Sequence, residues 1–485
     1  MSNVSANIVS ANIVSANIVS ANVAPSPCAL PHTPLADAAK GLDACVHCGF
    51  CLQACPTYVN LEDENDSPRG RLVLMRRLLD GDIAPTDPEV GAHFDRCLGC
   101  RACETACPSG VPYGELIEAT RATLAPLRGL PLVARVILRV FRMHALLHTV
   151  LFAARLFRDT RLPAWLAPKL PRRLGFPLAM LASTRPTPLT RTHGSRPSAT
   201  AVPSSSGSHS TASGVAASNG FRDTAIAVSS ANGFRDTAIA VSLLEGCVMH
   251  GLLNHINHDT QTAVQANGAK CIDTKGQRCC GALHAHAGDM DGARALARAN
   301  IAAFERSNPD VIIVNAAGCG AMLKQYGHLL HDDPSWAERA TRVAQKTRDV
   351  SEWLASVGPK TGSTALPLRV THDPPCHQMH AQRVVRQPLA VLEHISGLEL
   401  VPLEDADQCC GSAGIYNLVE PDTSDAVLAP KLQRIAETHA EVLATGNPGC
   451  LMQIGAGLHL AGSSVVVKHP IELLAASYNQ SAATR

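Results

Sequence analysis

Aromatic residues, charge imbalance and long apolar runs are all scarce in this chain of 485 residues. Aromatic side chains make up 4% of it, and the formal net charge is +1. A nearly neutral chain offers no strongly basic surface, so we expect no nucleic-acid partner. The first 24 residues contain no Lys or Arg, and the positively charged start of a secretory signal peptide is therefore missing. These features predict a cytoplasmic chain.

The apolar runs are too short for a transmembrane helix. In the most apolar stretch, residues 130–158, the longest run without a charged residue extends only from Met143 to Ala154, whereas a bilayer requires about 20 such residues. Arg135, Arg139 and Arg142 recur at helical spacing, which predicts an amphipathic helix. Such a helix either packs on its own domain or lies peripherally on a partner or on the inner face of the cell membrane.

Cysteine, by contrast, is abundant, with 18 residues. A disulfide framework is typical of small secreted domains, whereas clustered cysteines in a long cytoplasmic chain indicate metal or redox ligands. The glycine-rich fingerprint of a dinucleotide or flavin site is not evident. We therefore expect metal centres but no flavin on this chain.

Two runs of four cysteines share one spacing, Cys-x2-Cys-x2-Cys-x3-Cys-Pro, at residues 45–56 and 97–108. In two-cluster ferredoxins the first three cysteines of a run bind one [4Fe-4S] cluster, and the fourth, before proline, binds the other. The spacing predicts one cluster on Cys45, Cys48, Cys51 and Cys107, and a second on Cys97, Cys100, Cys103 and Cys55. Zinc is the alternative, but zinc sites usually draw their ligands from two separated pairs.

The segments around these runs predict a mainly helical ferredoxin-type domain over residues 37–125. Between the runs, residues 66–81 begin with Ser-Pro and carry apolar residues at helical spacing, which predicts a helix of about three turns. Its arginines, at positions 69, 71, 76 and 77, are expected to form a solvated face. A helical amphipathic segment follows over residues 126–184.

Two segments lack the patterns of folded structure. Residues 1–36 form a low-complexity tail that contains a five-residue repeat, SANIV, and residues 185–238 form a linker rich in Ser and Pro. The string NGFRDTAIAVS occurs at residues 219–229 and again at 232–242. Only the second copy continues into the apolar AVSLLEGC, so we expect that copy to open the next domain.

The remainder divides into two related halves, residues 239–360 and 361–485. The first holds Cys247, Cys279, Cys280 and Cys319, and the second holds Cys376, Cys409, Cys410 and Cys450. Between the first cysteine and the Cys-Cys-Gly string lie 31 residues in one half and 32 in the other. Apolar runs precede several of these cysteines, and helical stretches such as residues 289–306 and 429–446 lie between. Each half is predicted to be an α/β domain whose cysteines follow the carboxyl ends of parallel strands.

Four thiols from three loops suit an iron–sulfur cluster or zinc, although cysteine is also a common core residue. We expect these eight cysteines to form one additional cluster or a redox site. Nearby histidines are further candidates as ligands or proton carriers, although an ordinary structural role is the better interpretation for any single one: His250, His284, His286, His372, His377 and His380.

These motifs together resemble the iron–sulfur subunit of bacterial glycolate oxidase, over residues 37–160 and 240–475. The strings that carry the resemblance are CVHCGFCLQACPTY, DSPRGR, EGCVMHGLLNHINHDTQ, VNAAGCGAM, CCGSAGIYN and NPGCLMQI. The resemblance implies that FAD-binding partner subunits oxidise glycolate to glyoxylate, while this chain carries the electrons toward membrane quinone. The architecture also resembles two other groups. They are the iron–sulfur subunit of anaerobic glycerol-3-phosphate dehydrogenase and the heterodisulfide reductase-like proteins. Another donor, such as lactate, and a zinc-binding or redox-sensing scaffold remain as alternatives.

One feature departs from the fullest pattern of these relatives, in which each cysteine-rich half ends in Cys-x-x-Cys. Here Met322 and Gln453 occupy the final positions. The non-cubane cluster that the longer pattern implies is therefore not carried over to this chain.

Overall fold

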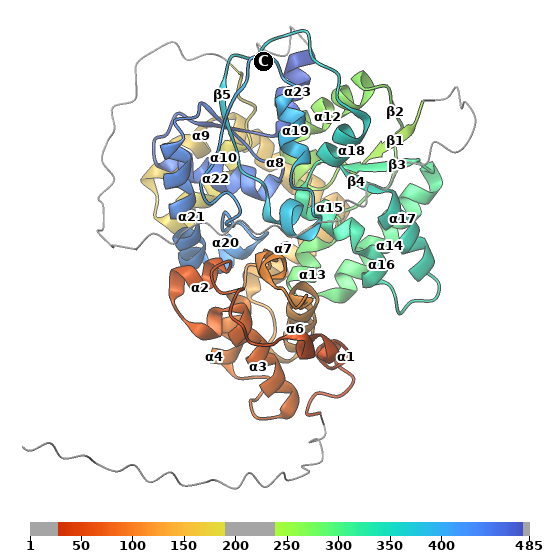
Figure 1. The fold of residues 1–485 in the computed structure, drawn as a ribbon, viewed down its shortest axis with the longest axis vertical. Helices are drawn as coiled ribbons and strands as arrows, with labels where there is room; N and C mark the ends of the chain where they lie inside the picture. The colour runs from red at the N-terminus through yellow and green to blue at the C-terminus, as the bar shows by residue number, and fades with distance from the viewer. Residues whose placement is uncertain (1–27, 190–237, 479–485) are drawn as a thin grey trace, which may run out of the picture.

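The computed structural model describes residues 28–189 and 238–478. A mainly helical part forms one end of the molecule, and two α/β domains lie side by side at the other end (Figure 1). The fold class predicted from the sequence is therefore confirmed. The SANIV repeat, the first copy of NGFRDTAIAVS and most of the Ser/Pro-rich segment lie outside the described residues.

The first part consists of short helices around the two cysteine runs. Its elements are α1 (Pro34–Asp37), η1 (Ala39–Ala44), α2 (Pro56–Leu61), η2 (Glu64–Asp66), α3 (Pro68–Asp80), α4 (Pro88–Asp95), α5 (Ala102–Ala106) and α6 (Tyr113–Arg128). The predicted helix between the runs is α3. Its first turn is capped by the Ser67 hydroxyl, which accepts a hydrogen bond from Gly70 N at 2.9 Å, and it ends at Gly81 in the left-handed conformation.

The predicted amphipathic helix is two helices rather than one. They are α7 (Leu132–Arg142) and α8 (His144–Asp159), which meet at an angle of 106° because Met143 is extended. Among the described residues no single helix is long and apolar enough to cross a membrane, and only this bent pair passes such a test when taken together. The segment continues with α9 (Leu162–Leu166), η3 (Ala167–Lys169) and α10 (Arg172–Ser183).

The first α/β domain has a four-stranded parallel sheet in the order β2-β1-β3-β4. Its strands are β1 (Ala240–Leu243), β2 (Lys270–Cys271), β3 (Val311–Val314) and β4 (Thr347–Asp349). Its helices are α11 (Val248–Leu252), α12 (Asn254–Ala266), α13 (Ala282–His286), α14 (Met290–Ser307), α15 (Ala317–Lys324), α16 (Tyr326–Leu329), α17 (Ala337–Lys346) and α18 (Val350–Val357). Strand β1 lies in the second copy of the duplicated string, as predicted.

The second α/β domain repeats this topology with the strand order β6-β5-β7-β8. Its strands are β5 (Arg369–His372), β6 (Glu399–Val401), β7 (Val442–Ala444) and β8 (Val466–Lys468). Its helices are η4 (His377–Ala381), α19 (Gln387–Glu393), α20 (Tyr416–Val419), α21 (Pro421–Glu437), α22 (Pro448–Leu460) and α23 (Pro470–Tyr478). The helix predicted over residues 429–446 is wrong in its second half, because the chain leaves α21 after Glu437 and forms β7.

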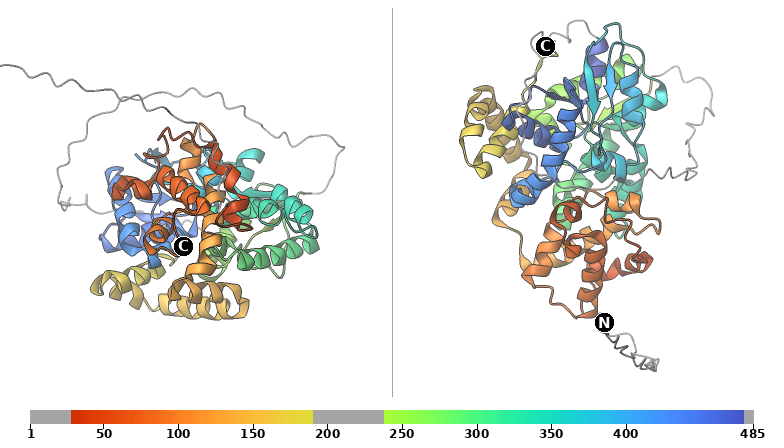
Figure 2. Two further views of the ribbon diagram at one scale, coloured as in Figure 1. Left: turned by 90° about the horizontal axis from the view of Figure 1, so that it is seen from below. Right: turned by 60° about the vertical axis from the view of Figure 1, so that its left-hand side comes forward.

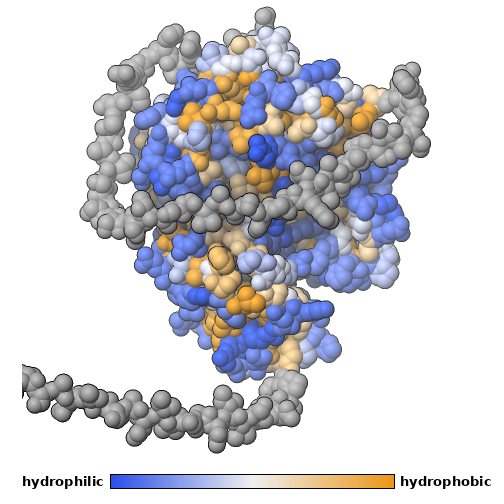
Figure 3. Space-filling model, viewed as in Figure 1, coloured by the Kyte–Doolittle hydropathy of each residue, from blue (hydrophilic) through white to orange (hydrophobic). Residues whose placement is uncertain are grey.

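Both sheets are wholly parallel, as predicted, and a cysteine follows the carboxyl end of each inner strand. Cys247 follows β1, Cys319 follows β3, Cys376 follows β5 and Cys450 follows β7. Helices α8 to α10 wrap the outside of the two domains, with α8 against α11 and α10 against α22 (Figure 2). The face seen in Figure 3 is a mixture of hydrophilic residues and smaller apolar patches.

Candidate metal centres

The two cysteine runs form two neighbouring cavities, each lined by thiols from both runs. Cys45, Cys48, Cys51 and Cys107 line one cavity, together with Cys103. Cys55, Cys97, Cys100 and Cys103 line the other. The structure therefore brings together the two crossed sets that the spacing predicted.

The two cavities share a wall, because Cys103 and Tyr113 line both. They differ in their access to solvent. Cys48 is exposed, whereas all four cysteines of the second cavity are buried. We refer to them as the outer and the inner thiol cavity.

Two guanidinium groups set the electrostatics of the inner cavity. Burial raises the pKa of the Cys97 thiol, but the cations of Arg71 and Arg121 more than offset it, so that this pKa lies below its ordinary value. Burial raises the pKa of Cys100 and of Cys103 well above the ordinary value. A thiolate is therefore most favourable at Cys97.

The expectation that Arg71 lies on a solvated face is wrong, since its side chain is fully buried. It pairs with Asp66 at 3.2 Å and donates hydrogen bonds to the Thr57 hydroxyl at 3.2 Å and to the backbone carbonyl of His93 at 2.6 Å. One charged and two neutral partners, from three separate segments, compensate the cost of burying this guanidinium. Helical spacing alone cannot reveal such partners.

The four thiols of the first α/β domain touch one another in a row. Cys279 contacts Cys247 and Cys280, and Cys280 contacts Cys319. The contact with Cys279, followed by burial, raises the pKa of Cys247 well above its ordinary value. Hydrogen bonds from both neighbours lower the pKa of Cys279 well below its ordinary value.

The second domain has the same row in the same order, Cys376, Cys409, Cys410 and Cys450. The sulfur atoms of Cys410 and Cys450 are 3.4 Å apart. The contact with Cys409 and then burial raise the pKa of Cys376 well above its ordinary value. Four thiols cannot all ionise at such proximity without a cation, which makes both rows suitable for a metal centre.

The glycine after each cysteine pair has a steric role. Gly281 and Gly411 both have positive φ, at +93° and +83°. A Cβ atom at Gly411 would lie 2.6 Å from the carbonyl oxygen of Ser424, and one at Gly281 would lie 3.2 Å from that of Ala293. The Cys-Cys-Gly string thus turns both thiols into the row while the chain passes closely over a helix.

The second row also adjoins the inner thiol cavity. Cys409 and Cys100 belong to one small buried cluster with Leu98 and Tyr416, and Cys376 packs against it. The Tyr416 hydroxyl donates a hydrogen bond to the carbonyl of Arg96 at 2.8 Å, which joins the second domain to the ferredoxin-type part. Three thiol sets therefore follow one another from the exposed Cys48 into the interior.

The surroundings of the two rows differ in charge. In the first domain, neutral groups hold the cysteine pair: Asn300 donates to the Cys279 carbonyl at 3.0 Å and the Tyr326 hydroxyl donates to the Cys280 carbonyl at 2.8 Å. In the second, a buried ion pair joins Lys431 and Asp373 at 2.9 Å. Burial lowers the pKa of Lys431, but Asp373 outweighs it, and the net pKa is raised. Sequence analysis missed these residues because none lies in a cysteine motif.

The two residues that depart from the longer pattern are both buried, and Gln453 is fully occupied by hydrogen bonds. Its amide oxygen accepts from Asn417 at 2.8 Å, and its amide nitrogen donates to the Ser424 hydroxyl at 2.8 Å. Ser424 in turn donates to the Gly411 carbonyl at 2.9 Å. Gln453 therefore fixes the turn that carries Cys409 and Cys410 and is not free to bind a metal, whereas Met322 packs in the apolar core.

The candidate histidines are scattered. His250 pairs with Glu245, and His284 pairs with Asp289. His286 pairs with Glu118, and His380 bonds Thr105, while His372 is buried at the end of β5. Among these residues only His377 has a recorded contact with a predicted cysteine ligand, with its Nδ1 atom 3.8 Å from the Cys376 sulfur. Burial lowers the pKa of His377 to about 3, so its ring is neutral.

Comparison with known proteins agrees with the division into a ferredoxin-type part and two cysteine-rich α/β domains. Residues 41–111 match the family described as a 4Fe-4S dicluster domain, and residues 241–324 and 370–455 match the family described as a cysteine-rich domain. Taken with the buried thiol sets, the first match indicates an iron–sulfur protein.

Full-length relatives extend the match along the chain. The chain is 34% identical to the probable glycolate oxidase iron-sulfur subunit of Bacillus subtilis, over 89% of this chain and 92% of the relative. It is 30% identical to the glycolate oxidase iron-sulfur subunit of Escherichia coli, over 90% and 94%. Lactate utilization protein A of Geobacillus thermodenitrificans is 32% identical over 47% of this chain and 95% of its own length. Because these two subunits are at least 30% identical to the chain over about nine-tenths of its length, the chain belongs to the family of glycolate oxidase iron-sulfur subunits.

Proposed function

We propose that this chain is the electron-transfer subunit of a flavin-dependent glycolate oxidase complex, which passes electrons from the oxidation of glycolate to glyoxylate toward a quinone-type acceptor. One observation carries the proposal: the outer cavity, the inner cavity and the second cysteine row adjoin one another. Such a series suits single-electron transfer over short steps. The names of the full-length relatives support glycolate as the donor.

We assign the predicted [4Fe-4S] clusters to the two cavities, with the ligand sets that line them. The row in the second domain is the better candidate for a further cluster, since it adjoins the inner cavity. Clusters bound there would accept and release electrons one at a time. The protein itself supplies thiol ligands, the buried guanidinium of Arg71 and the half-buried one of Arg121 near the inner cavity, and backbone N–H donors such as that of Gly99, 3.4 Å from the Cys97 sulfur.

The outer cavity is the proposed entry point for electrons from FAD-binding partner subunits. Val46 and Phe50 flank its cysteines and are 67% and 68% exposed. Exposed apolar side chains of this size next to a redox centre are typical of an interaction surface. This supports docking of the flavoprotein at the loop of residues 45–51.

We propose a cytoplasmic chain that binds peripherally to the inner face of the cell membrane through α7 and α8. These helices expose Leu132, Val136 and Phe152, and α7 carries the three arginines at positions 135, 139 and 142. An apolar surface with arginines beside it suits an anionic lipid interface. Sedimentation with anionic vesicles tests this: the parent chain is expected to sediment, and a V136E/F152E variant is expected to remain in the supernatant.

Lactate is the second candidate donor, because lactate utilization proteins also match. Their match covers only 47% of this chain. The matches of the two glycolate oxidase subunits cover 89% and 90% of it. Glycerol-3-phosphate has no such support. Identifying the flavoprotein that copurifies with the chain, and the hydroxyacid that reduces it, decides between these donors.

Iron and acid-labile sulfide analysis of anaerobically purified protein tests the proposal against a zinc-binding or sensor scaffold. About eight irons per chain correspond to two clusters and about twelve to three, and zinc without sulfide would reject the proposal. In the complex, Cys45→Ser is expected to abolish glycolate-dependent reduction of quinone while the partner retains its flavin. Cys28→Ser, at an exposed cysteine outside every set, is the matched control.

A further inference from the structure

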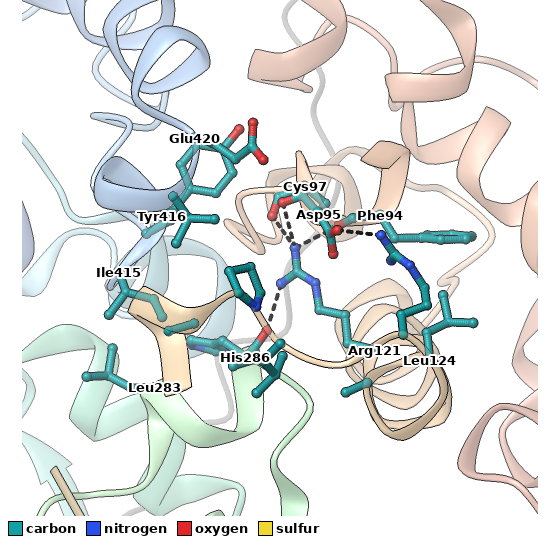
Figure 4. Close-up of a pocket in the computed structure, with 18 of the residues that line it drawn as sticks. Phe94, Asp95, Cys97, Arg121, Leu124, Leu283, His286, Ile415, Tyr416 and Glu420 are labelled. Atoms are coloured by element: carbon teal, nitrogen blue, oxygen red, sulfur yellow. Dashed lines mark hydrogen bonds and ion pairs between the residues drawn. The ribbon is translucent and has the colours of Figure 1, made fainter. Parts of the chain in front are cut away.

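A cavity of about 160 Å³ lies where the ferredoxin-type part meets both α/β domains (Figure 4). Its walls come from α6, the start of α7, α13 of the first domain and α20 of the second. Cys97, a predicted cluster ligand, lines it too. The cavity is therefore separate from the two thiol cavities but touches the inner one.

Most of the lining is apolar. Leu124 lies on one side of the cavity, while Leu283 and Ile415 approach from the two α/β domains (Figure 4). Ala134 of α7 adds a further apolar wall. A cavity with this lining suits a small hydrophobic ring system rather than a sugar or a phosphate.

The polar groups of the cavity exclude a simple anion. Arg121 is engaged by the protein itself, since its terminal nitrogens donate to the carbonyls of His286 at 2.9 Å, Phe94 at 2.8 Å and Cys97 at 2.5 Å. Arg128 is paired with Asp95 at 3.0 Å, and the carboxyl of Glu420, which is half-buried, would repel an anion. Burial, with the charge of Asp95 adding to it, raises the pKa of Glu420 above its ordinary value.

Glu420 can instead serve a ligand that carries carbonyl oxygens and takes up protons, and Tyr416 lines the cavity beside it. Tyr416 and Glu420 lie together on one side of the cavity (Figure 4). The Tyr416 hydroxyl donates to the Arg96 carbonyl, so its position is fixed. Glu420 is half-buried, so it can exchange a proton with solvent and present it inside the cavity.

The approach to the cavity is also apolar. Leu130 and Pro131, at the start of α7, line the cavity. On the same helix Leu132, Val133 and Val136 are 68%, 51% and 54% exposed. A ligand with a hydrophobic tail would thus meet an apolar surface where it enters.

From this combination we infer that the cavity binds the headgroup of a quinone, the electron acceptor of the complex. The inference deepens the proposed function and rests on it. Glycolate releases two electrons and two protons on becoming glyoxylate, and a quinone takes up two of each as its two carbonyls become hydroxyls. Cys97 lies beside the ring, and Glu420 delivers protons from solvent to a carbonyl oxygen.

Photolabelling of the full chain, purified anaerobically with its iron, tests this directly. The probe is an azido-benzoquinone with a short alkyl tail, and decylubiquinone is the competitor. Peptides that contain Leu283–Ala287 or Ile415–Glu420 are expected to carry the label, and the competitor is expected to remove it. Ala287→Trp, which fills the cavity from α13, is expected to reduce labelling at least tenfold. Ala355→Trp, at a half-buried alanine of α18 outside the lining, is expected to label as the parent does.

The outcomes separate the two proposals. The quinone site is overturned if the label is found elsewhere on the chain, or if Ala287→Trp and the parent are labelled equally. In either case the iron and sulfide content still decides whether the chain transfers electrons. Absence of sulfide overturns the proposed function whatever the labelling. Iron content shows whether Ala287→Trp is folded, and Ala125→Trp, on the α6 wall, gives a second blocked variant. Glu420→Gln is expected to keep the label, since it removes only the proton carrier.

Discussion

The two α/β domains have the same fold and the same row of four thiols, yet only the second adjoins the inner thiol cavity. Its Cys409 packs with Cys100, whereas Cys279 and Cys280 of the first domain lie in the core of that domain. The environments differ accordingly, with neutral hydrogen bonds around the first row and the Lys431–Asp373 ion pair beside the second. A shared motif therefore does not imply a shared role, because position in the assembly and local charge decide what each row can do.

Removing the central thiol of each row gives the largest expected effect. Cys409→Ser and Cys279→Ser should each lose any iron bound by their own row, because a serine oxygen is a poor ligand for iron–sulfur centres. Only Cys409→Ser should also change the electron paramagnetic resonance signal of the centre at Cys100, since these two cysteines are in contact. Cys271→Ser, at a cysteine outside every set, is the control. A changed signal in Cys279→Ser would contradict the comparison.

The buried ion pair predicts the largest difference in stability. Lys431→Met leaves Asp373 buried and unpaired, and we expect it to lower the free energy of unfolding by about 3 to 5 kcal/mol. In the first domain, Lys324 pairs with Glu352 at 2.6 Å at a more exposed position, so Lys324→Met is expected to cost less than about 1 kcal/mol. Urea denaturation followed by circular dichroism measures both. If both variants lowered the free energy of unfolding equally, burial of the ion pair would not determine its contribution to stability.

The sequence indicates the thiol sets because their spacing is local and chemically specific, and their binding of metal stays a prediction. It also predicted the parallel sheets, since β1 and β3 are apolar runs that lead to cysteines. It could not predict β2, β7 or β8, which have two or three residues and no pattern of their own. The burial of Arg71 and Lys431 depends on partners distant in the chain, and no proline or glycine stands at the bend at Met143 to signal it. The cavity beside Cys97 exists only where three parts of the fold meet.

Mild acid is expected to weaken the second domain more than the first. Burial lowers the pKa of His372 and of His469 to about 4, so between pH 6.5 and 4 the unfolded chain binds more protons and stability falls as the pH falls. In the first domain burial raises the pKa of Asp259 and of Asp349 to about 6. There the folded chain binds more protons between pH 6 and 3.8, so acid stabilises it.

Hydrogen exchange at pH 7 and at pH 4.5, corrected for intrinsic rates, measures this difference. Peptides of residues 369–478 should lose protection, and those of residues 240–357 should lose less. His372→Leu cannot take up a proton and should reduce the acid sensitivity of the second domain. Equal loss in both domains would refute the assignment of these groups.

The smallest expected effect compares the two positions that depart from Cys-x-x-Cys. Gln453→Leu leaves the Asn417 amide and the Ser424 hydroxyl without their buried partner, and we expect it to cost about 1 to 3 kcal/mol in the free energy of unfolding. Met322→Leu conserves volume in an apolar site and is expected to cost less than about 1.5 kcal/mol. Because Ser424 holds the Gly411 turn, Gln453→Leu should also lower the iron content of the second row, and Met322→Leu should leave the iron content unchanged. Unaltered iron in Gln453→Leu would show that the second row keeps its geometry without this network.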